Sequence, residues 1–320
     1  MNTKVIVLTP VRNEAWILHR FLQATSLYAD HIIVLDQFSD DGSQAICQQY
    51  PKVTLLHAEN EQYDEAERQI RLIDKAREIA PNDQRLLLAL DSDEIFAADA
   101  LQHPEWQQML QAAPGSVFYF NKHDLFKSPA HYLDYQSPWP LAFMDDGSPH
   151  QPKKIHSIRI PVPEGAQKVV LEHLNILHYS KVDLRRQRAK MRMYAAIQNV
   201  NSIGSTHSRR LRYSRHSDWI DGGIVKETPD AWYQGYEAQG IDMRTIASDD
   251  YFWQDRKVIE LMEEHGSRRF WKEDIWETDW QTTARHFGRS KLQIQSPHIL
   301  NRFYWDFQSW LYRVYLSLKN

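Results

Sequence analysis

Three acidic residues follow an apolar run in the first third of the chain. Residues 86–90 are Leu-Leu-Leu-Ala-Leu, and Asp91, Asp93 and Glu94 come within the next four positions. Such a run predicts a buried strand of a parallel sheet, and ligands bind at the carboxyl ends of these strands. Carboxylates two positions apart can share a divalent cation, because hard cations take oxygen ligands. The stretch therefore indicates either a site for a metal and the phosphates it carries or an acidic loop after a core strand.

Polar and acidic residues also follow two earlier apolar runs. The first run, residues 4–9, leads into a turn that contains Pro10, Arg12 and Glu14, and the second, residues 31–36, ends at Asp36 and leads to Asp40 and Asp41. Asp41 precedes a glycine, which is also ordinary turn chemistry. Because parallel strands end at a common edge of the sheet, we expect these residues to form one polar edge together with Asp91 and Asp93.

The elements that position these residues alternate along the chain. Apolar strands are predicted at 4–9, 31–36, 53–57 and 86–90, with helices at 14–28, 44–49 and 61–80 between them. This order predicts an α/β fold with right-handed connections and a parallel sheet. A helix at 104–112 and strands at 116–121, 153–160, 168–172 and 175–178 follow, and then helices at 182–200, 229–239, 250–265, 275–287 and 300–318. We expect a domain over 1–225, with halves 1–122 and 123–225, and a helical C-terminal extension over 226–320.

Composition excludes several classes of protein. Hydrophobic residues make up 42% of the chain, enough for a sizeable core, and the formal net charge of −4 argues against a nucleic-acid-binding protein. The single cysteine, Cys47, excludes an intramolecular disulfide and suits a reducing compartment, and no apolar run reaches the roughly 20 residues of a membrane span. A cytoplasmic protein is therefore expected. The glycine-rich dinucleotide and P-loop motifs, the H-E-x-x-H zinc motif and the G-x-S-x-G elbow are absent from the sequence.

Three segments together resemble the family 2 glycosyltransferases of the GT-A fold. They are Thr9-Pro-Val-Arg-Asn-Glu14, Ile32–Ser43 with its Asp-x-x-Ser-x-Asp-Gly-Ser turn, and Leu90-Asp-Ser-Asp-Glu94. The resemblance implies a GT-A type, mostly parallel sheet flanked by helices. It also implies an enzyme that uses Mn²⁺ or Mg²⁺ to move a sugar from a nucleotide-diphosphate donor, with UDP as the preferred carrier. The acceptor would be a hydroxyl of a saccharide or glycolipid, and the transfer would invert the anomeric carbon.

The resemblance also implies roles for individual residues. Pro10, Arg12 and Glu14 would line the base and ribose, and Asp40 or Asp41, with Asp36 as the alternative, would contact the base. Arg68 or Arg71 would approach the nucleotide. Asp91 would contact the ribose or the metal's waters, with Ser92 beside it, Asp93 would bind the cation, and His178 would complete the metal shell. Among the ten Lys and Arg residues at 181–216, Lys190 would face the diphosphate, and most of the others are expected on a solvated face.

Several alternatives remain open at the level of sequence. Asp145, Asp146 and Glu172 are the candidates for the general base that activates the acceptor. A sugar nucleotidyltransferase is a rival function, although such enzymes usually have a glycine-rich loop after the first strand, and residues 9–14 contain no glycine. A non-catalytic homologue that binds a nucleotide sugar is a second rival. The final helix is expected to pack on the catalytic domain or on a second subunit, with a peripheral position on the inner face of a membrane as its alternative.

Overall fold

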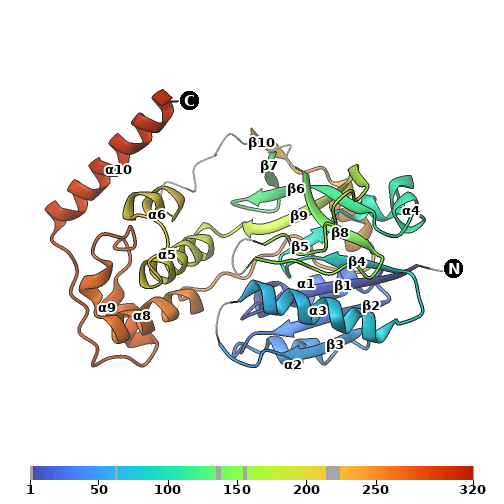
Figure 1. Cartoon of the computed structure of the whole chain (residues 1–320). Coiled ribbons are helices and arrows are strands. Elements are labelled where there is room, and N and C mark those ends of the chain that lie inside the picture. Colours follow the sequence, from blue (N-terminus) through green and yellow to red (C-terminus); the bar gives the residue numbers. More distant parts are fainter. Residues whose placement is uncertain (1–2, 62–63, 135–137, 154–156, 214–223, 320) are drawn as a thin grey trace. The chain divides into compact units, whose positions relative to one another are not determined.

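The computed structural model describes residues 3–61, 64–134, 138–153, 157–213 and 224–319, and Figure 1 shows their arrangement as a ribbon. The chain divides into two compact units. The first contains residues 1–182 and 224–247, and the second contains residues 183–223 and 248–320. The segment 183–223, which the sequence analysis assigned to the first domain, belongs to the second unit. The division of the first domain into a donor half and an acceptor half stays a prediction.

The first unit is built on one mixed sheet. Its strands are β1 (Lys4–Val11), β2 (His31–Asp36), β3 (Val53–His57), β4 (Arg85–Ala89), β5 (Glu94–Phe96), β6 (Val117–Phe126), β7 (His131–Asp134), β8 (Pro138–Asp145), β9 (Lys168–Lys181) and β10 (Ile224–Glu227). The order is β10-β7-β6-β8-β4-β1-β2-β3, and β9 pairs with both β5 and β6. Strands β1 to β4 are parallel to one another, as is the β6–β9 pair, whereas β8, β7 and β10 are antiparallel to their neighbours. The predicted α/β class is therefore confirmed.

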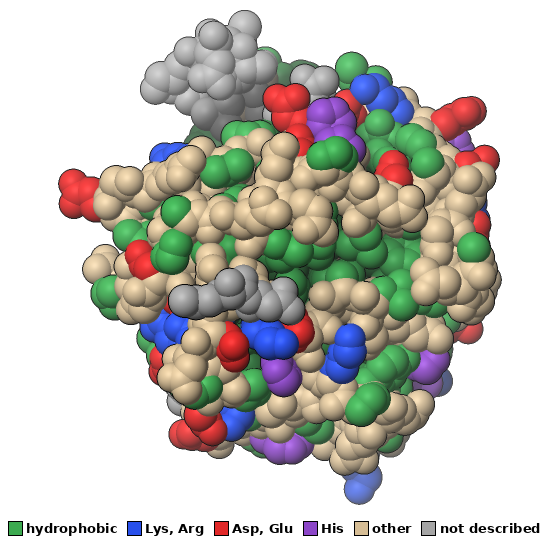
Figure 2. All heavy atoms as spheres, turned by 90° about the vertical axis from the view of Figure 1, so that its right-hand side faces the viewer, with side chains coloured by type: hydrophobic (Ala, Val, Ile, Leu, Met, Phe, Trp, Pro, Cys, Tyr) green, Lys and Arg blue, Asp and Glu red, His purple; other side chains and the backbone are tan. Residues whose placement is uncertain are grey.

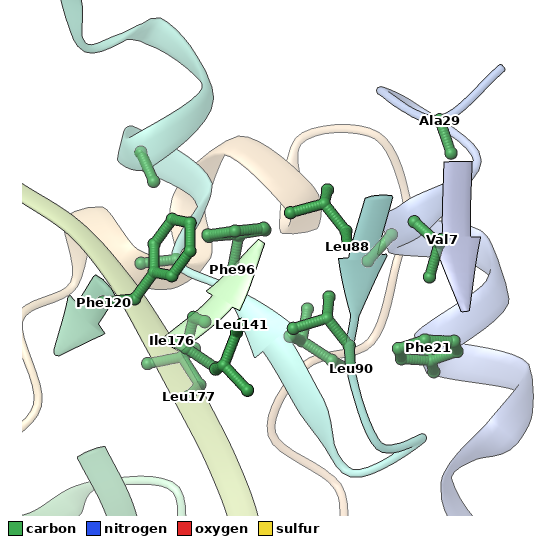
Figure 3. Packing of buried hydrophobic residues seen from close by; sticks show 14 of the residues in the cluster. Val7, Phe21, Ala29, Leu88, Leu90, Phe96, Phe120, Leu141, Ile176 and Leu177 are labelled. Carbon is green, nitrogen blue, oxygen red and sulfur yellow. The ribbon is translucent and has the colours of Figure 1, made fainter. Parts of the chain in front are cut away.

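Alternation along the strands divides the core between the two faces of the sheet. Val5 and Val7 lie in one buried cluster with Phe21 of α1 (Ala15–Thr25), whereas Ile6 and Leu8 lie in another with Leu72 of α3 (Glu65–Ile79). Figure 3 shows how the first cluster continues from Val7 and Phe21 through Leu88 and Leu90 to Phe96, Phe120 and Ile176. The remaining helices of this unit are α2 (Ser43–Cys47), the 3₁₀ helix η1 (Ala98–Gln102), α4 (Pro104–Leu110) and α7 (Ala231–Glu237).

The second unit is helical. It contains α5 (Leu184–Val200), α6 (Thr206–Tyr213), α8 (Trp253–His265), the 3₁₀ helix η2 (Ser267–Phe270), α9 (Trp280–His286) and α10 (Ile299–Lys319). Met193, Val258, Phe270 and Trp276 belong to its core. The expectation that most basic residues of 181–216 lie on a solvated face is wrong for four arginines. These are all buried: Arg188, Arg192, Arg209 and Arg210. Each bonds to a carboxylate or a backbone carbonyl, which offsets part of the cost of burying its charge.

Other sequence-based expectations fail where strands are long or contain proline. The two strands predicted at 168–172 and 175–178 form the single strand β9, and β8 was missed because Pro138 and Pro140 argue against a strand. No strand forms at Lys153 or at 157–160, and the rest of the strand predicted at 153–160 lies outside the described residues. In the part of the chain that the structure describes, no helix is long and apolar enough to cross a membrane. On the face drawn in Figure 2, acidic and basic side chains are interspersed.

Candidate functional site

The carboxyl ends of three parallel strands meet at one edge of the sheet. Val11 of β1 is in register with Asp36 of β2, and Leu8 of β1 is in register with Ala89 of β4. The turn after β1 therefore lies between the end of β2 and the acidic turn after β4. This arrangement brings together the residues that the sequence analysis placed at one edge of the sheet, Pro10, Asp36 and Asp91 among them.

Hydrogen bonds join the turn after β1 to the turn after β2. Asn13 has a left-handed backbone, with φ of 55°, and its side-chain oxygen accepts from the Asp40 N–H at 2.8 Å. The Asp41 carboxylate accepts from the backbone N–H groups of Ala15 and Ser43 and from the Ser43 hydroxyl. The Glu14 carboxylate accepts from the indole N–H of Trp16 at 2.7 Å. The fold itself thus uses Asp41 and Glu14 to shape these turns.

Asp36 has bonding capacity that the fold does not use. Its side chain is 2% exposed, and its Oδ2 accepts from the Ser39 N–H and from the Gln44 amide. Its Oδ1 is buried and accepts no hydrogen bond from the described residues. Leaving a buried acceptor unmatched costs about 1 to 3 kcal/mol, so a ligand that supplies an N–H or O–H group here would gain that energy. Of the carboxylates predicted to contact a base, Asp36 therefore fits the role best.

A narrow pocket lies where β1, β4 and α3 meet. Its walls are Leu8, Pro10, Arg68, Gln69, Leu72, Ala89 and Arg159. Its volume of about 10 Å³ holds roughly one water molecule, so a larger ligand requires the wall to move. The structure also separates two predicted arginines. Arg68 lines the pocket, whereas Arg71 donates to the His57 carbonyl at 2.8 Å.

Two cations neutralise the acidic turn after β4. The Arg159 guanidinium contacts Asp91 and Glu94 at 2.5 Å each, and Lys122 contacts the other Glu94 oxygen at 3.1 Å. Glu94 also closes the turn, since its carboxylate accepts from the Asp91 N–H. Burial alone would raise the pKa of Glu94, but Arg159 and Lys122 hold it well below its usual range. Glu94 is therefore an anchor of the turn, and Asp91 lies against a guanidinium.

Asp93 faces a histidine that is held by a second carboxylate. The His178 Nε2 lies 3.5 Å from Asp93 Oδ2, and its Nδ1 lies 2.5 Å from Asp124 Oδ1. Lys181 contacts the other Asp124 oxygen at 3.1 Å. Burial and Lys122 would lower the pKa of His178, but Asp93 and Asp124 raise it to about 9. Burial would raise the pKa of Asp124, yet the charges of His178 and Lys181 hold it well below its usual range.

The remaining predicted residues lie apart from this group or have other contacts. The candidate bases Asp145 and Asp146 are at the opposite end of the sheet, because Asp145 is in register with Arg85 at the start of β4. Asp145 is buried against Arg77 and Arg85, and Asp146 caps a turn through the Ser148 N–H. Glu172 is exposed on β9, beside an irregularity in the pairing of β9 with β6 that separates it from His178. The structure therefore does not bring Asp145 and Asp146 to the acidic turn, and the role of Glu172 as a base stays a prediction.

Three other predictions have simpler outcomes. Ser92 is buried within the acidic turn, and Arg12 contacts Glu61 at 3.2 Å. Lys190 is on α5 in the second unit, and its role toward a diphosphate stays a prediction.

Sequence reasoning missed Asp124, Lys122 and Arg159. Lys122 and Asp124 share β6, where polar residues interrupt an otherwise apolar strand, and this interruption is the signal that could have identified them. Arg159 lies within the segment 153–160 that was predicted to be a strand, and its distance from Asp91 in the sequence gives no hint of the contact. Lys122 and Arg159 matter because their positive charges neutralise Asp91 and Glu94.

The first 100 or so residues match a known family. Residues 6–104, under a third of the chain, match the family model of glycosyl transferase family 2. The resemblance seen in the sequence motifs is therefore confirmed for this region, which contains β1 to β5. No curated protein sequence matches the chain.

Solved structures give only distant likenesses. A crystal structure of 4-diphosphocytidyl-2C-methyl-D-erythritol synthase is 12% identical, with a TM-score of 0.29, and the match covers 59% of this chain and 79% of that one. HddC from Yersinia pseudotuberculosis is 8% identical, with a TM-score of 0.32, over 56% and 93%. A glycosyltransferase involved in the glycosylation of the major capsid of PBCV-1 is 13% identical, with a TM-score of 0.28, over 55% and 93%.

Proposed function

We propose that this protein is a metal-dependent glycosyltransferase. It would take a sugar from a nucleotide-diphosphate donor, with UDP as the preferred carrier, and transfer it to an acceptor hydroxyl with inversion. One observation carries the proposal: residues from three family motifs, with Asp36, Pro10 and Asp93 among them, lie at or just after the carboxyl ends of neighbouring strands in a family 2 region. That edge of a parallel sheet is where nucleotides bind in α/β folds.

The contacts around Asp93 fit a divalent cation. Adjacent oxygen or nitrogen ligands of Mg²⁺ lie about 3 Å apart, since each is about 2.1 Å from the ion, and Asp93 Oδ2 and His178 Nε2 are 3.5 Å apart. Asp124 holds the other nitrogen of His178, as a carboxylate commonly does behind a metal-binding histidine. Asp91 is bound to Arg159, so Asp93 and His178 are the two protein ligands that we propose for Mn²⁺ or Mg²⁺. A bound cation would neutralise the diphosphate of the donor.

The chain's own residues would bind and orient the donor. Asp36 Oδ1 offers the base an acceptor, and Gln69, whose side-chain amide nitrogen has no partner among the described residues, offers a donor from the pocket wall. Arg159 and Lys122 supply positive charge beside the acidic turn, which favours departure of a diphosphate. Arg159 is also a wall of the narrow pocket, so we infer that it shifts when the nucleotide enters.

The proposal can be tested without knowing the acceptor. Thermal unfolding is followed for the wild-type protein with UDP, GDP or dTDP, each with and without Mn²⁺. We expect a rise in the unfolding midpoint that requires both nucleotide and cation, since a ligand that binds only the folded state stabilises it by mass action. Hydrolysis of UDP-sugars in the presence of Mn²⁺ would then identify the donor through the release of UDP.

Matched variants make this test specific. Asp93→Asn should abolish the stabilisation that depends on the cation, whereas Asp83→Asn, an exposed acid near the start of β4, should keep it. Equal stabilisation of the two variants would contradict the assignment of Asp93. Release of pyrophosphate from a nucleoside triphosphate and a sugar phosphate would instead support the nucleotidyltransferase. Nucleotide binding without turnover of any nucleotide sugar would favour a non-catalytic homologue.

A further inference from the structure

A second group of possible metal ligands lies on the first unit, away from the acidic turn. Among the described residues, His103, Glu105 and His173 form a group of three whose ligand atoms lie within 4.8 Å of one another. His103 and Glu105 begin α4, and His173 projects from β9. The two imidazole rings are stacked, with centroids 4.4 Å apart and planes 17° apart. Two segments about 70 positions apart in the sequence therefore place three ligand-type side chains together.

The polar contacts in this group place a hydrogen bond where a metal ion could bind. Glu105 Oε1 lies 2.9 Å from His173 Nδ1, and Glu105 Oε2 accepts from the His173 backbone N–H. His103 Nδ1 lies 3.9 Å from Glu105 Oε2. Ligands at about 2.0 to 2.1 Å in a tetrahedron lie roughly 3.3 Å apart, so the separations of 2.9 and 3.9 Å bracket the required value. Small side-chain rotations would bring one nitrogen of each histidine and one Glu105 oxygen around a single ion.

Accessibility and chemistry indicate the kind of ion. The His103 and His173 side chains are 35% and 61% exposed, so an ion can enter without opening the core. Two imidazoles and one carboxylate suit Zn²⁺ and the neighbouring transition metals, whereas Mg²⁺ and Ca²⁺ prefer oxygen ligands. The fourth position would be taken by water, as at other zinc sites with three protein ligands.

We propose that His103, Glu105 and His173 bind Zn²⁺ or a similar transition-metal ion, which joins the start of α4 to β9. The ion replaces the proton that His173 Nδ1 shares with Glu105, and that proton leaves to solvent. It also replaces the weak 3.3 Å contact of the Glu105 N–H with His103 Nδ1. Because β9 also carries His178, the ion stabilises the strand that reaches the acidic turn. The proposal does not depend on the glycosyltransferase assignment.

Zinc binding is measured in a background that lacks the other proposed metal ligands. The variant Asp93→Asn/His178→Gln is treated with chelator, dialysed and titrated with Zn²⁺ in a calorimeter near neutral pH. We expect one Zn²⁺ per chain. Adding His103→Gln and His173→Gln should weaken this binding at least tenfold, whereas adding His57→Gln, which changes an exposed histidine at the end of β3, should leave it unchanged. Unchanged Zn²⁺ binding after the His103→Gln and His173→Gln changes, or no Zn²⁺ binding in the background protein, would overturn the proposal.

A second measurement covers the case in which a variant does not fold. Co²⁺ is added to the wild-type protein and to the Asp93→Asn protein, and its visible absorption is recorded before and after a drop in pH. Four-coordinate Co²⁺ with nitrogen ligands is expected in both proteins, and the signal should be lost as protons displace the ion. Absorption typical of fully hydrated Co²⁺ in both proteins would also overturn the proposal.

Discussion

Carboxylates meet cations in both compact units, but the cluster around Arg192 in the second unit is more fully matched than the charges at the sheet edge of the first. In the second unit, both Asp255 oxygens bond to the Arg192 guanidinium, at 2.8 and 2.7 Å, and Glu277 takes a third bond at 2.9 Å. The Arg192 and Asp255 side chains are only 8% and 6% exposed. In the first unit, Asp91 is 33% exposed, and the buried Asp36 Oδ1 has no partner among the described residues.

This difference indicates which charges stabilise the fold and which are available to bind a ligand. Buried ion pairs persist when each donor meets an acceptor, and the loss of one partner leaves an uncompensated charge. An acceptor that stays unmatched in the interior is unfavourable unless another molecule completes it. The Arg192–Asp255 pair is therefore expected to affect stability, whereas Asp36 and Asp93 are expected to affect binding and turnover.

The substitution Asp93→Asn tests most directly whether the charges of the first unit affect turnover rather than stability. The amide keeps the size of the side chain but weakens a proposed cation ligand, so turnover of a nucleotide sugar should fall about 10²- to 10³-fold. At about pH 10 and in the absence of cation, where His178 is mostly uncharged, the free energy of unfolding should change by less than about 1 kcal/mol. Steady-state kinetics and urea unfolding measure the two effects. A large loss of stability with normal turnover would reverse the roles assigned to the two groups of charges.

The complementary test is Arg192→Met in the second unit. The methionine leaves Asp255 buried without its guanidinium partner, so the free energy of unfolding should fall by about 3 to 5 kcal/mol. Urea unfolding measures the loss, and Arg256→Met, a partly exposed residue on the same helix as Asp255, serves as the control. If Arg192→Met unfolds like the wild-type protein, the buried pair does not hold the unit together.

The sequence predicted the part of the site that rests on local pattern. The runs that became β1 to β4 have clear boundaries, and the residues after them form short turns, so Asp36, Asp91 and Asp93 could be placed at one sheet edge in advance. Asp93 and His178 were also paired in advance, but through the family resemblance. Neither periodicity nor spacing predicted that β9 would bring His178 beside the acidic turn.

The remainder depends on contacts between residues far apart in the sequence. Arg159 and Glu94 are 65 positions apart, and no local rule predicts which guanidinium will meet a buried acid. Asp124 was missed because a polar residue inside a strand indicates an exposed face unless its partners are known. The candidate base Asp145 failed for a related reason. β8 runs antiparallel to β4, so the end of β8 lies beside the start of β4 and opposite the site.

The pH dependence of stability would sharpen the role of His178. Its pKa of about 9 in the folded protein exceeds the value of about 6.5 expected when unfolded. The stabilisation by its charged form is therefore complete below about pH 6.5 and is lost as pH rises through 9. In cation-free buffer, the free energy of unfolding should fall by up to about 3 kcal/mol across this window. His178→Gln should lack this fall, and an identical pH profile for both proteins would contradict the contacts with Asp93 and Asp124.

The smallest expected effect tests whether Arg159 competes with a cation for the acidic turn. Arg159→Met removes the guanidinium that neutralises Asp91 but leaves Lys122 on Glu94. Coulomb attraction at a half-exposed site is worth about 1 to 2 kcal/mol after screening, so Mn²⁺ should bind the variant roughly tenfold more tightly when no nucleotide is present. Manganese electron paramagnetic resonance measures the free ion directly. Arg68→Met, which changes another wall of the same pocket, is the control, because the Arg68 guanidinium contacts Gln37 and Glu65. Weaker Mn²⁺ binding in Arg159→Met would mean that the guanidinium helps to organise the cation site, and the half-exposed charges would then resemble the matched ones of the second unit.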